Sequence, residues 1–317
     1  MGHVWITGEA LIDFVPITVP QGTAYLPCEG GSTYNVAKAT ARQGSDVSFL
    51  GPISQDLFGD MLRDDLAREG VELRYAPRID APTPLAFVKY EGSDARYAFY
   101  DRASTMVEAP YGETLSDLRP GDILHAGSIS LIPDPGADRL ERLMLAHRDR
   151  AILSLDPNAR PGMIADMDKW RNRISRLADA ATILRLSDED LSAWQPGRDP
   201  RDFIDTQLAS GTALVVLTYG KHGAEAATPA GRARVPARTD GLVDTVGAGD
   251  TVMGTVLAAV DGHGLTNPDQ IAALGDTALE DLLTRAMRAA WLNCHSAGCN
   301  PPTRRAIDSD ASLEPSE

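Results

Sequence analysis

Cysteine is scarce in this 317-residue sequence, and so are apolar runs long enough to enter a membrane. Cys28, Cys294 and Cys299 are too few and too scattered for a disulfide framework, and they lack the paired spacing and the four ligands of a zinc site. No apolar run reaches the ~18 residues of a membrane span, and no basic segment followed by an apolar stretch opens the chain. We therefore expect a cytoplasmic protein that has no membrane partner.

Positive charge is also in short supply. The chain carries 30 Lys and Arg against 45 Asp and Glu, which gives a formal net charge of -15. This balance argues against an extended nucleic-acid surface, because such a surface needs a dense basic patch. No Gly-rich loop ends in Gly-Lys-Ser/Thr, so a P-loop is absent. If the protein binds a small phosphorylated ligand, the positive field must come from arginine, a metal ion and backbone N–H groups.

Short apolar runs alternate with amphipathic segments along most of the chain. The runs predict buried strands at residues 4–7, 47–50, 123–125, 151–155, 182–186 and 213–218. The amphipathic segments predict helices at residues 33–43, 57–70, 140–147, 251–260 and 279–294. Strand–helix alternation over this length predicts an α/β fold with a mostly parallel sheet that is covered on both faces.

Two segments break this alternation. Residues 85–90 and 96–100 flank a five-residue loop and predict a β-hairpin. Residues 10–15 and 23–28 predict a second hairpin, joined by a loop that contains Pro16, Pro20 and Gly22. Neither hairpin fits a βαβ core, so we expect a small separate sheet that is inserted in two segments. This sheet is either a lid that covers a binding site or a structural appendage at the edge of the core.

The sequence Asp-Thr-Val-Gly-Ala-Gly-Asp occupies residues 244–250, directly before a predicted helix. Gly247 and Gly249 flank Ala248, so the backbone can turn tightly and approach a ligand closely. The free N–H groups of the first helical turn, together with the helix dipole, form a ready site for phosphate. Asp250 is a candidate base that takes a proton from a hydroxyl attacking a phosphoryl group. Taken alone, these residues fit equally well a glycine turn with Asp250 as a favourable first-turn acid.

Polar residues near the N-terminus are candidates for binding a polyol. Gly30 and Gly31 precede a predicted helix, and Asn35 lies in its first turn, where the amide offers both a donor and an acceptor. A plain N-cap beside a flexible hinge would give the same pattern. Asp13 lies within an apolar run, so its carboxylate either points to solvent by strand alternation or accepts hydrogen bonds from two sugar hydroxyls.

Three further clusters of polar residues come directly after predicted strands. Open α/β sheets bind their ligands there, beyond the carboxyl ends of the strands. Asn158 and Arg160 follow Asp156-Pro157 and could bind a metal ion and a phosphate, although a simple Asp-Pro turn would give the same sequence pattern. Residues 187–190, Ser-Asp-Glu-Asp, either cap the next helix or hold magnesium through water. Residues 218–223, Thr-Tyr-Gly-Lys-His-Gly, either hold a nucleotide phosphate or form a turn between strands.

Taken together, these residues resemble those of the ribokinase-like sugar kinases, the PfkB carbohydrate kinase family, from Gly8 to about Pro302. The N-terminal pattern of the family is matched by Gly30-Gly31 with Asn35, and further by Gly51-Pro52-Ile53 and Asp56-Leu57-Phe58-Gly59. Residues 244–250 match its C-terminal pattern without a departure. Two long motifs in this order and spacing are far more specific than either alone, so the chain is identified as a member of the family.

The resemblance implies a Rossmann-like fold, in which a mostly parallel sheet is flanked by helices and a small β-sheet lid covers the sugar. It assigns residues 1–9, 29–82 and 104–317 to the core with the nucleotide and catalytic site, and residues 10–28 and 83–103 to the lid. It also implies ATP and Mg²⁺ as cofactors. A homodimer through the lid is a further expectation, because an exposed β lid can pair with a second copy.

The resemblance also implies roles for individual residues. Phosphoryl transfer would use Asp250 as the base, the backbone of Gly247, Ala248 and Gly249 as the anion hole, and Arg160. The sugar would be held by Asp13, Gly30, Gly31, Asn35, Tyr100 and Arg102. The nucleotide would be held by Asn158, Ser187, Thr218, Gly220, Gly223 and Asn293, with Asp190 toward the metal.

Departures from the family pattern bear on which sugar is bound. The fructokinase sequence Gly-Gly-Ala-Pro-Ala-Asn is here Gly-Gly-Ser-Thr-Tyr-Asn, which is closer to 2-keto-3-deoxygluconate kinases. Tyr100-Asp101-Arg102 resembles the Tyr-x-Arg by which those kinases hold a carboxylate, whereas residues 126–131 and Asp156-Pro157-Asn158 resemble fructokinases. Many relatives carry Asn-x-x-Glu where this chain has Ser187-x-x-Asp190, so the acid is kept but shortened.

We therefore expect an ATP-dependent kinase that phosphorylates a primary hydroxyl of a ketohexose, with fructose as the first candidate. The alternatives are a sugar-acid kinase, a ribokinase or nucleoside kinase, and a catalytically silent sugar sensor on the same fold. The position of Arg102 distinguishes the first two candidates. An Arg102 that faces the sugar pocket favours an anionic substrate, and one that points to solvent favours fructose.

Overall fold

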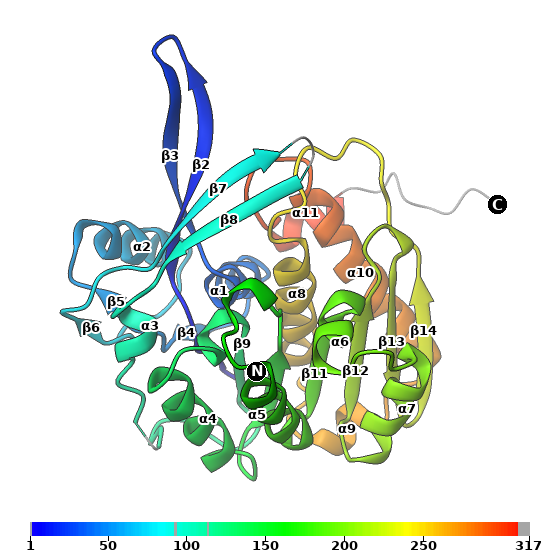
Figure 1. Cartoon of the computed structure of the whole chain (residues 1–317). Coiled ribbons are helices and arrows are strands. Elements are labelled where there is room, and N and C mark those ends of the chain that lie inside the picture. The colour runs from blue at the N-terminus through cyan, green and yellow to red at the C-terminus, as the bar shows by residue number, and fades with distance from the viewer. Residues whose placement is uncertain (1, 92–93, 113, 310–317) are drawn as a thin grey trace.

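The computed structural model describes residues 2–91, 94–112 and 114–309, without the side chains of residues 89–97. Within this part of the chain, a central sheet of eight strands runs in the order β14-β13-β12-β11-β10-β9-β1-β4 (Figure 1). Its strands are β1 (Val4–Ile6), β4 (Val47–Phe49), β9 (Ile123–Gly127), β10 (Ile152–Asp156), β11 (Ile183–Ser187), β12 (Leu214–Thr218), β13 (Ala224–Thr228) and β14 (Gly231–Val235). The first six pair in parallel, and β13 and β14 continue the sheet in antiparallel pairing.

Successive side chains of the parallel strands point to opposite faces of the sheet, and both faces are apolar. Ile123 and Ile183 pack into one hydrophobic cluster, and their neighbours Leu124 and Leu184 pack into the other. The first cluster is covered by α1 (Ser32–Arg42), α2 (Leu57–Arg68), α8 (Ala248–Gly262), α9 (Pro268–Ala272) and α10 (Asp276–Asn293). The second is covered by α4 (Gly136–Ala146), α5 (Met167–Ala180), α6 (Asp188–Trp194) and α7 (Pro200–Ala209). The predicted fold class is thereby confirmed.

A second sheet lies beside the core, in the order β3-β2-β7-β8 (Figure 1). It is built from β2 (Leu11–Val19), β3 (Gly22–Gly30), β7 (Leu85–Glu91) and β8 (Asp94–Tyr100). The pairs β2–β3 and β7–β8 are antiparallel hairpins, and β2 pairs with β7 in parallel through Ile12, Asp13 and Phe14. The hairpin of β2 and β3 projects from the body of the molecule.

The hairpins are longer than the sequence predicts. Pro16 was expected in a loop but lies inside β2, opposite Tyr25. Because β7 pairs with β2 only as far as Phe14, the outer part of β2 has one partner, and a proline is tolerated there. In the other hairpin the strands extend to Glu91 and resume at Asp94, so three of the five expected loop residues are in strands; Gly92 and Ser93 lie outside the described residues.

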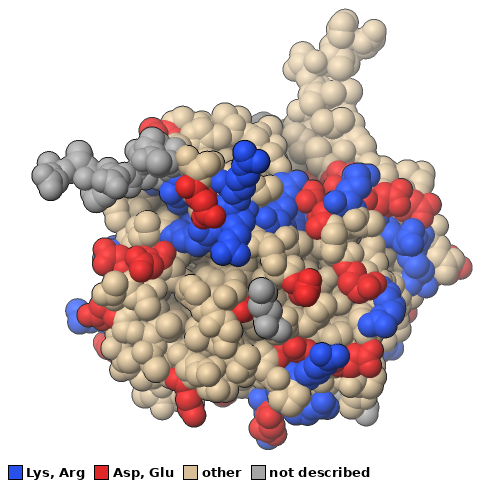
Figure 2. Space-filling model, turned by 180° about the vertical axis from the view of Figure 1, so that it is seen from behind, with Lys and Arg blue, Asp and Glu red and all other residues tan. Residues whose placement is uncertain are grey.

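Short elements complete the fold: β5 (Ile53–Ser54), β6 (Arg78–Ile79), α3 (Thr105–Glu108), α11 (Arg304–Ser309) and the 3₁₀ helices η1 (Ser128–Leu131), η2 (Pro161–Met163) and η3 (Gly220–His222). None of the helices in the described residues is both long and apolar enough to cross a membrane. On the face seen from behind, acidic and basic side chains lie side by side, and the basic ones gather in the upper part of the view (Figure 2).

Candidate active site

Two hollows lie at opposite ends of the strands of the central sheet. The first has a volume of about 670 Å³ and lies beyond the carboxyl ends of β1, β9, β10 and β11, where open α/β sheets bind ligands. Its lining includes the following candidates named above: Asp13, Gly31, Asn35, Asn158, Arg160, Ser187, Asp190, Gly247, Ala248, Gly249 and Asp250. The fold therefore brings most of the sequence-predicted residues into one hollow, from five separate parts of the chain.

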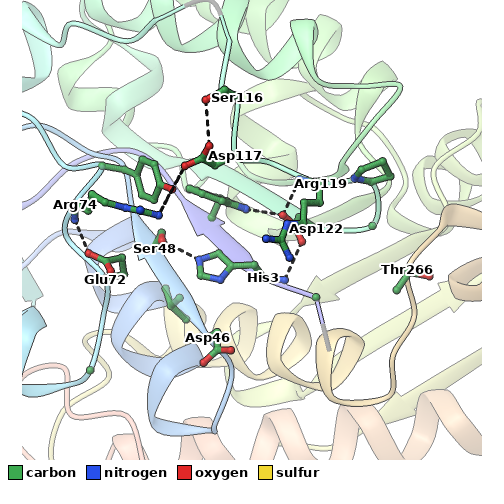
Figure 3. Close-up of a pocket in the computed structure, with 17 residues that line it drawn as sticks. His3, Asp46, Ser48, Glu72, Arg74, Ser116, Asp117, Arg119, Asp122 and Thr266 are labelled. Atoms are coloured by element: carbon green, nitrogen blue, oxygen red, sulfur yellow. Dashed lines mark hydrogen bonds and ion pairs between the residues drawn. The ribbon is translucent and has the colours of Figure 1, made fainter.

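The second hollow, of about 990 Å³, lies at the start of β1, β4 and β9 and contains none of the predicted site residues (Figure 3). Its side chains are paired with one another. The indole of Trp5 donates to Asp122, the ring of His3 lies 2.8 Å from the Ser48 hydroxyl, and Tyr75 donates to Asp117. The first hollow is the better candidate for chemistry because it gathers most of the predicted site residues at the carboxyl ends of the strands.

The glycine turn before α8 has the geometry that an anion site needs. Gly247 has φ +74° and ψ 4°, and a Cβ at this position would lie 2.2 Å from the Cys299 sulfur, so only glycine fits. A Cβ on Gly249 would lie 2.7 Å from the Arg185 guanidinium. No side chain caps the first turn of α8, and residues 247–250 line the hollow, so the positive end of the helix dipole faces it. The backbone N–H of Ala248 donates to the carbonyl of Thr245 at 3.2 Å.

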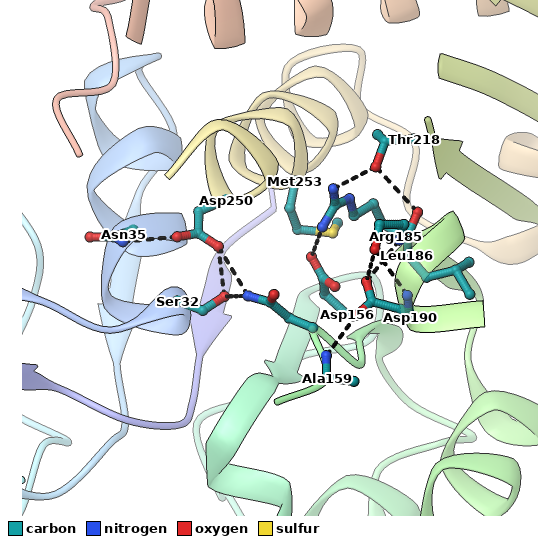
Figure 4. Close-up of polar contacts among 12 residues, drawn as sticks. Ser32, Asn35, Asp156, Ala159, Arg185, Leu186, Asp190, Thr218, Asp250 and Met253 are labelled. Carbon is teal, nitrogen blue, oxygen red and sulfur yellow. Dashed lines mark hydrogen bonds and ion pairs between the residues drawn. The ribbon is translucent and has the colours of Figure 1, made fainter. Parts of the chain in front are cut away.

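Asp250 lies in the first turn of α8 and is 6% exposed. The Asn35 amide donates to one carboxylate oxygen at 2.8 Å, and the Ser32 hydroxyl donates to the other at 2.7 Å (Figure 4). Burial raises the pKa of Asp250, and the hydrogen bonds from Asn35 and Ser32 and the charges of Arg160 and Arg185 oppose this rise. A carboxylate held in this way is oriented for proton transfer.

Asn158 and Arg160 follow the carboxyl end of β10. Asn158 has φ +36°, a left-handed conformation that few residues other than glycine and asparagine adopt. Its amide nitrogen donates to the Ser32 hydroxyl at 2.7 Å, and its amide oxygen accepts from Arg160 at 2.7 Å. Arg160 is exposed and lines the hollow, and its Nη1 also donates to the backbone carbonyls of Asn158 and Ala159.

Arg185 is a buried cation beneath the glycine turn. From the centre of β11 it donates to Asp156 on β10 at 2.9 Å and to Thr218 at the end of β12 at 2.8 Å (Figure 4). Burial raises the pKa of Asp156 to about 7, against the opposing charge of Arg185. Among the described side chains that line the hollow, Arg160 and Arg185 are the two cations, against six carboxylates: Glu9, Asp13, Glu189, Asp190, Asp244 and Asp250.

Two of these carboxylates, the buried Glu9 and the half-buried Asp13, lie on the opposite side of the hollow. Burial raises the pKa of Glu9 to about 7 and that of Asp13 to about 6, and the charge of Asp250 adds to both rises. Glu9 accepts hydrogen bonds from the backbone N–H of Ser32 at 2.9 Å and of Ser130 at 3.3 Å. Glu9 therefore connects the start of α1 to η1, which follows β9, whereas Asp13 lines the hollow.

Asp190 and Ser187 form a capping box at the start of α6. One carboxylate oxygen of Asp190 accepts from the backbone N–H of Ala159 at 2.6 Å, and the other accepts from the backbone N–H of Ser187 at 2.8 Å. The capping interpretation of this acidic segment is therefore present in the structure. Because both oxygens already accept hydrogen bonds, a metal role for Asp190 stays a prediction.

Other predicted residues lie outside the lining of this hollow. Tyr100 is 64% exposed, and Arg102 is exposed as well. Gly220 and Gly223 form the turn between the antiparallel strands β12 and β13, and Thr218 contacts Arg185. Gly30 borders Asp13, since a Cβ on Gly30 would lie 2.5 Å from that carboxylate. The buried Asn293 donates to the carbonyl of Val246 at 2.8 Å and so braces the glycine turn from behind.

Sequence reasoning missed Glu9, Ser32 and Arg185 as site residues. A signal for Arg185 was present, because an arginine inside the buried run Ile-Leu-Arg-Leu must find a partner or a task. Ser32 fitted an ordinary helix cap, and nothing in the sequence shows that it meets Asp250, which is 218 positions away.

The pfkB family carbohydrate kinase model matches residues 1–306 of the chain. A fructokinase of Rhizobium leguminosarum bv. trifolii is 37% identical over 279 residues, which cover 86% of this chain and 84% of the relative. A fructokinase of Klebsiella pneumoniae is 33% identical over 287 residues, with 86% and 88% covered. The structure of a fructokinase with bound ATP from Xylella fastidiosa superimposes with a TM-score of 0.84 at 26% identity, and the match covers 97% of each chain. The chain therefore belongs to the pfkB family of carbohydrate kinases, and the protein is a sugar kinase.

Proposed function

We propose that this sugar kinase transfers the γ-phosphoryl group of ATP to a primary hydroxyl of fructose. The observation that carries the proposal is the position of Asp250, a buried carboxylate at the start of α8, in a hollow that combines an anion-binding turn with a carboxylate-lined side. The names of the Rhizobium and Klebsiella relatives support fructose as the acceptor, and the ATP bound to the Xylella enzyme supports ATP as the donor.

In the proposed reaction, Asp250 accepts the proton of the sugar hydroxyl as its oxygen attacks the γ-phosphorus. The bond between the γ-phosphorus and the bridging oxygen breaks, and ADP leaves with the electron pair. The backbone N–H groups of residues 247–249 and the two arginines stabilise the charge on the transferred group. Arg185 is already fixed by Asp156 and Thr218, so its charge needs no reorganisation during the reaction.

We propose that magnesium enters with the nucleotide, as MgATP. Within the described residues, no group of three or more His, Cys, Asp and Glu side chains is placed to hold a metal ion. This fits Mg²⁺, which keeps several waters and is commonly bound by substrate phosphates and one or two carboxylates. Glu189 and Asp190 line the nucleotide side of the hollow and would contact the ion through water. Magnesium would neutralise charge on the phosphates.

We propose that the four-stranded sheet, with residues 10–28 and 83–103, acts as a lid over the sugar. Leu11 and Phe99 from this sheet line the hollow beside Asp13, so the sheet already forms one wall. Closing such a wall over a bound sugar would exclude water from the reacting groups. Asp13 and Asn35 would hold the sugar through its other hydroxyls.

A neutral sugar fits this arrangement better than a sugar acid. Arg102 is exposed and lies outside the lining of the hollow, and Tyr100 is also exposed. The sugar side instead carries Glu9 and Asp13, whose carboxylates, when ionised, would repel a substrate carboxylate.

A coupled assay of ADP release tests the proposal. With MgATP, fructose should give the highest kcat/KM among fructose, ribose, tagatose, 2-keto-3-deoxygluconate and adenosine, because the pocket favours a neutral polyol. Addition of EDTA should abolish turnover while sugar binding, measured by calorimetry, persists. If 2-keto-3-deoxygluconate is the better substrate, the fructose assignment is wrong. Sugar binding without any ADP release under all conditions would instead indicate a sensor.

We further propose that two copies of the chain pair through the lid. β3 is an edge strand, and the hairpin of β2 and β3 exposes Ile17, Tyr25 and Leu26 by 40%, 43% and 50%. An exposed edge strand with apolar side chains is a template for pairing with another chain. Light scattering should therefore give the mass of two chains for the native protein and of one chain for Leu26→Lys. A native protein with the mass of one chain would rule out this pairing.

A further inference from the structure

Four side chains form a directional series of hydrogen bonds that ends on the catalytic base. Arg160 donates to the amide oxygen of Asn158 at 2.7 Å, the amide nitrogen of Asn158 donates to the Ser32 hydroxyl at 2.7 Å, and that hydroxyl donates to Asp250 at 2.7 Å. Ser32 and Asp250 meet directly in front of α8 (Figure 4). The series therefore runs from a cation on the phosphate side to the base on the sugar side.

The direction of each bond follows from the chemistry of its partners. A guanidinium only donates, so the Asn158 oxygen must face Arg160, and the amide nitrogen then faces Ser32. Because the Ser32 oxygen accepts from that nitrogen, its single proton is left for the carboxylate of Asp250. Hydrogen bonds arranged head to tail in this way polarise and strengthen one another.

The position of Ser32 does not depend on its hydroxyl. Its backbone N–H donates to Glu9 at 2.9 Å, and it begins α1, whose next turn supplies Asn35 to the other oxygen of Asp250. Removal of the Ser32 hydroxyl should therefore leave the backbone and the Asn35 contact in place. The change removes one donor from the base and leaves two others, the Asn35 amide and, at the longer distance of 3.5 Å, the amide nitrogen of Asn158.

We propose that Ser32 is a positioning residue for phosphoryl transfer, which restrains the carboxylate of Asp250 and transmits to it the influence of Arg160 through Asn158. The inference rests on the proposed function, since it takes Asp250 as the base. Charged arginine at one end and ionised carboxylate at the other both favour this arrangement of protons. The series thus couples the group that faces the phosphate to the group that activates the sugar.

Several titratable groups face Asp250 besides this series. They are Glu9, Asp13, Asp156, Arg185 and the thiol of Cys299. None of them is altered when Ser32 is changed. The Ser32 hydrogen bond lowers the pKa of Asp250, so its loss should raise that pKa and move the acid limb of the kcat/KM profile to higher pH.

The test is the pH dependence of kcat/KM for whichever sugar the native enzyme phosphorylates best. We expect Ser32→Ala to move the acid limb upward by about one pH unit, the size of effect that a hydrogen bond to a charged group has on a pKa. Arg160→Met should also move the limb upward, and in the double variant the combined shift should be smaller than the sum, because both changes act on one series.

The matched control is Ser175→Ala, which removes a hydroxyl that bonds to Trp194 and to a backbone carbonyl outside the hollow. Its profile should coincide with that of the native enzyme. An unmoved acid limb in Ser32→Ala, or shifts that simply add in the double variant, would overturn the inference. A native protein that phosphorylates no sugar would instead refute the proposed function, so the two failures are distinguishable.

Discussion

Asp250→Asn should lower kcat by about 10³- to 10⁴-fold, the upper range of what a positioned general base contributes. The substitution keeps the shape of the side chain but removes the site that accepts the proton of the attacking hydroxyl. Sugar affinity should change by only a few-fold, because Asp13 and Asn35 remain in the hollow. Initial rates of ADP release and calorimetric titration with fructose measure the two quantities separately.

Asp261→Asn is the control for this change. Asp261 lies near the end of the same helix, is 4% exposed and is absent from the lining of the hollow. Like Asp250→Asn, this substitution removes a buried carboxylate from α8, but it changes no residue that lines the hollow. Turnover should therefore stay near the native rate. Native turnover in Asp250→Asn would remove Asp250 from the catalytic role, whatever the effect on sugar binding.

Arg185→Met should lower kcat by about 10²-fold, close to the loss that follows removal of one preorganised electrostatic group from a reacting site. Arg185 is 5% exposed, and its guanidinium lies directly beneath the turn at Gly249. Methionine fills much of the same volume without the charge. The affinity for fructose should be nearly unchanged, because the arginine lies beneath the turn at Gly249, which is the proposed phosphate site.

The loss of Arg185 also leaves Asp156 as a buried carboxylate without its cation, which is itself destabilising. The double variant Arg185→Met with Asp156→Asn removes both members of the pair and should recover thermal stability while kcat stays low. Arg185→Lys keeps the charge but cannot contact Asp156 and Thr218 at the same time, so its kcat should lie between that of the native enzyme and that of Arg185→Met. If the double variant regains the native kcat, the arginine serves the fold and not the reaction.

The central strands could be predicted from sequence because parallel strands with two buried faces read as continuous apolar runs, as at Leu214–Thr218. The two antiparallel strands that extend the sheet could not. Ala224–Thr228 and Gly231–Val235 consist largely of small and polar residues, and their strand conformation depends on pairing with β12 and with each other. The extension of β2 through Pro16 depends likewise on where its neighbour ends.

The candidate site shows the same division. Asp250 and the glycine turn were predicted because a local motif carries their chemistry, and both line the hollow. The partners of Asp250 were not predicted, since Ser32 reaches it from 218 positions away. The role of Arg185 likewise requires the lateral register of three strands, which brings Asp156 and Thr218 to the guanidinium.

A crystal structure with fructose and a non-hydrolysable ATP analogue would test the central claim most directly. We predict that one primary hydroxyl oxygen lies within hydrogen-bond distance of the Asp250 carboxylate and in line with the γ-phosphorus, and that the γ-phosphate contacts the backbone N–H groups of residues 247–249. A complex in which the sugar hydroxyl nearest the γ-phosphorus has no contact with Asp250 would contradict the account.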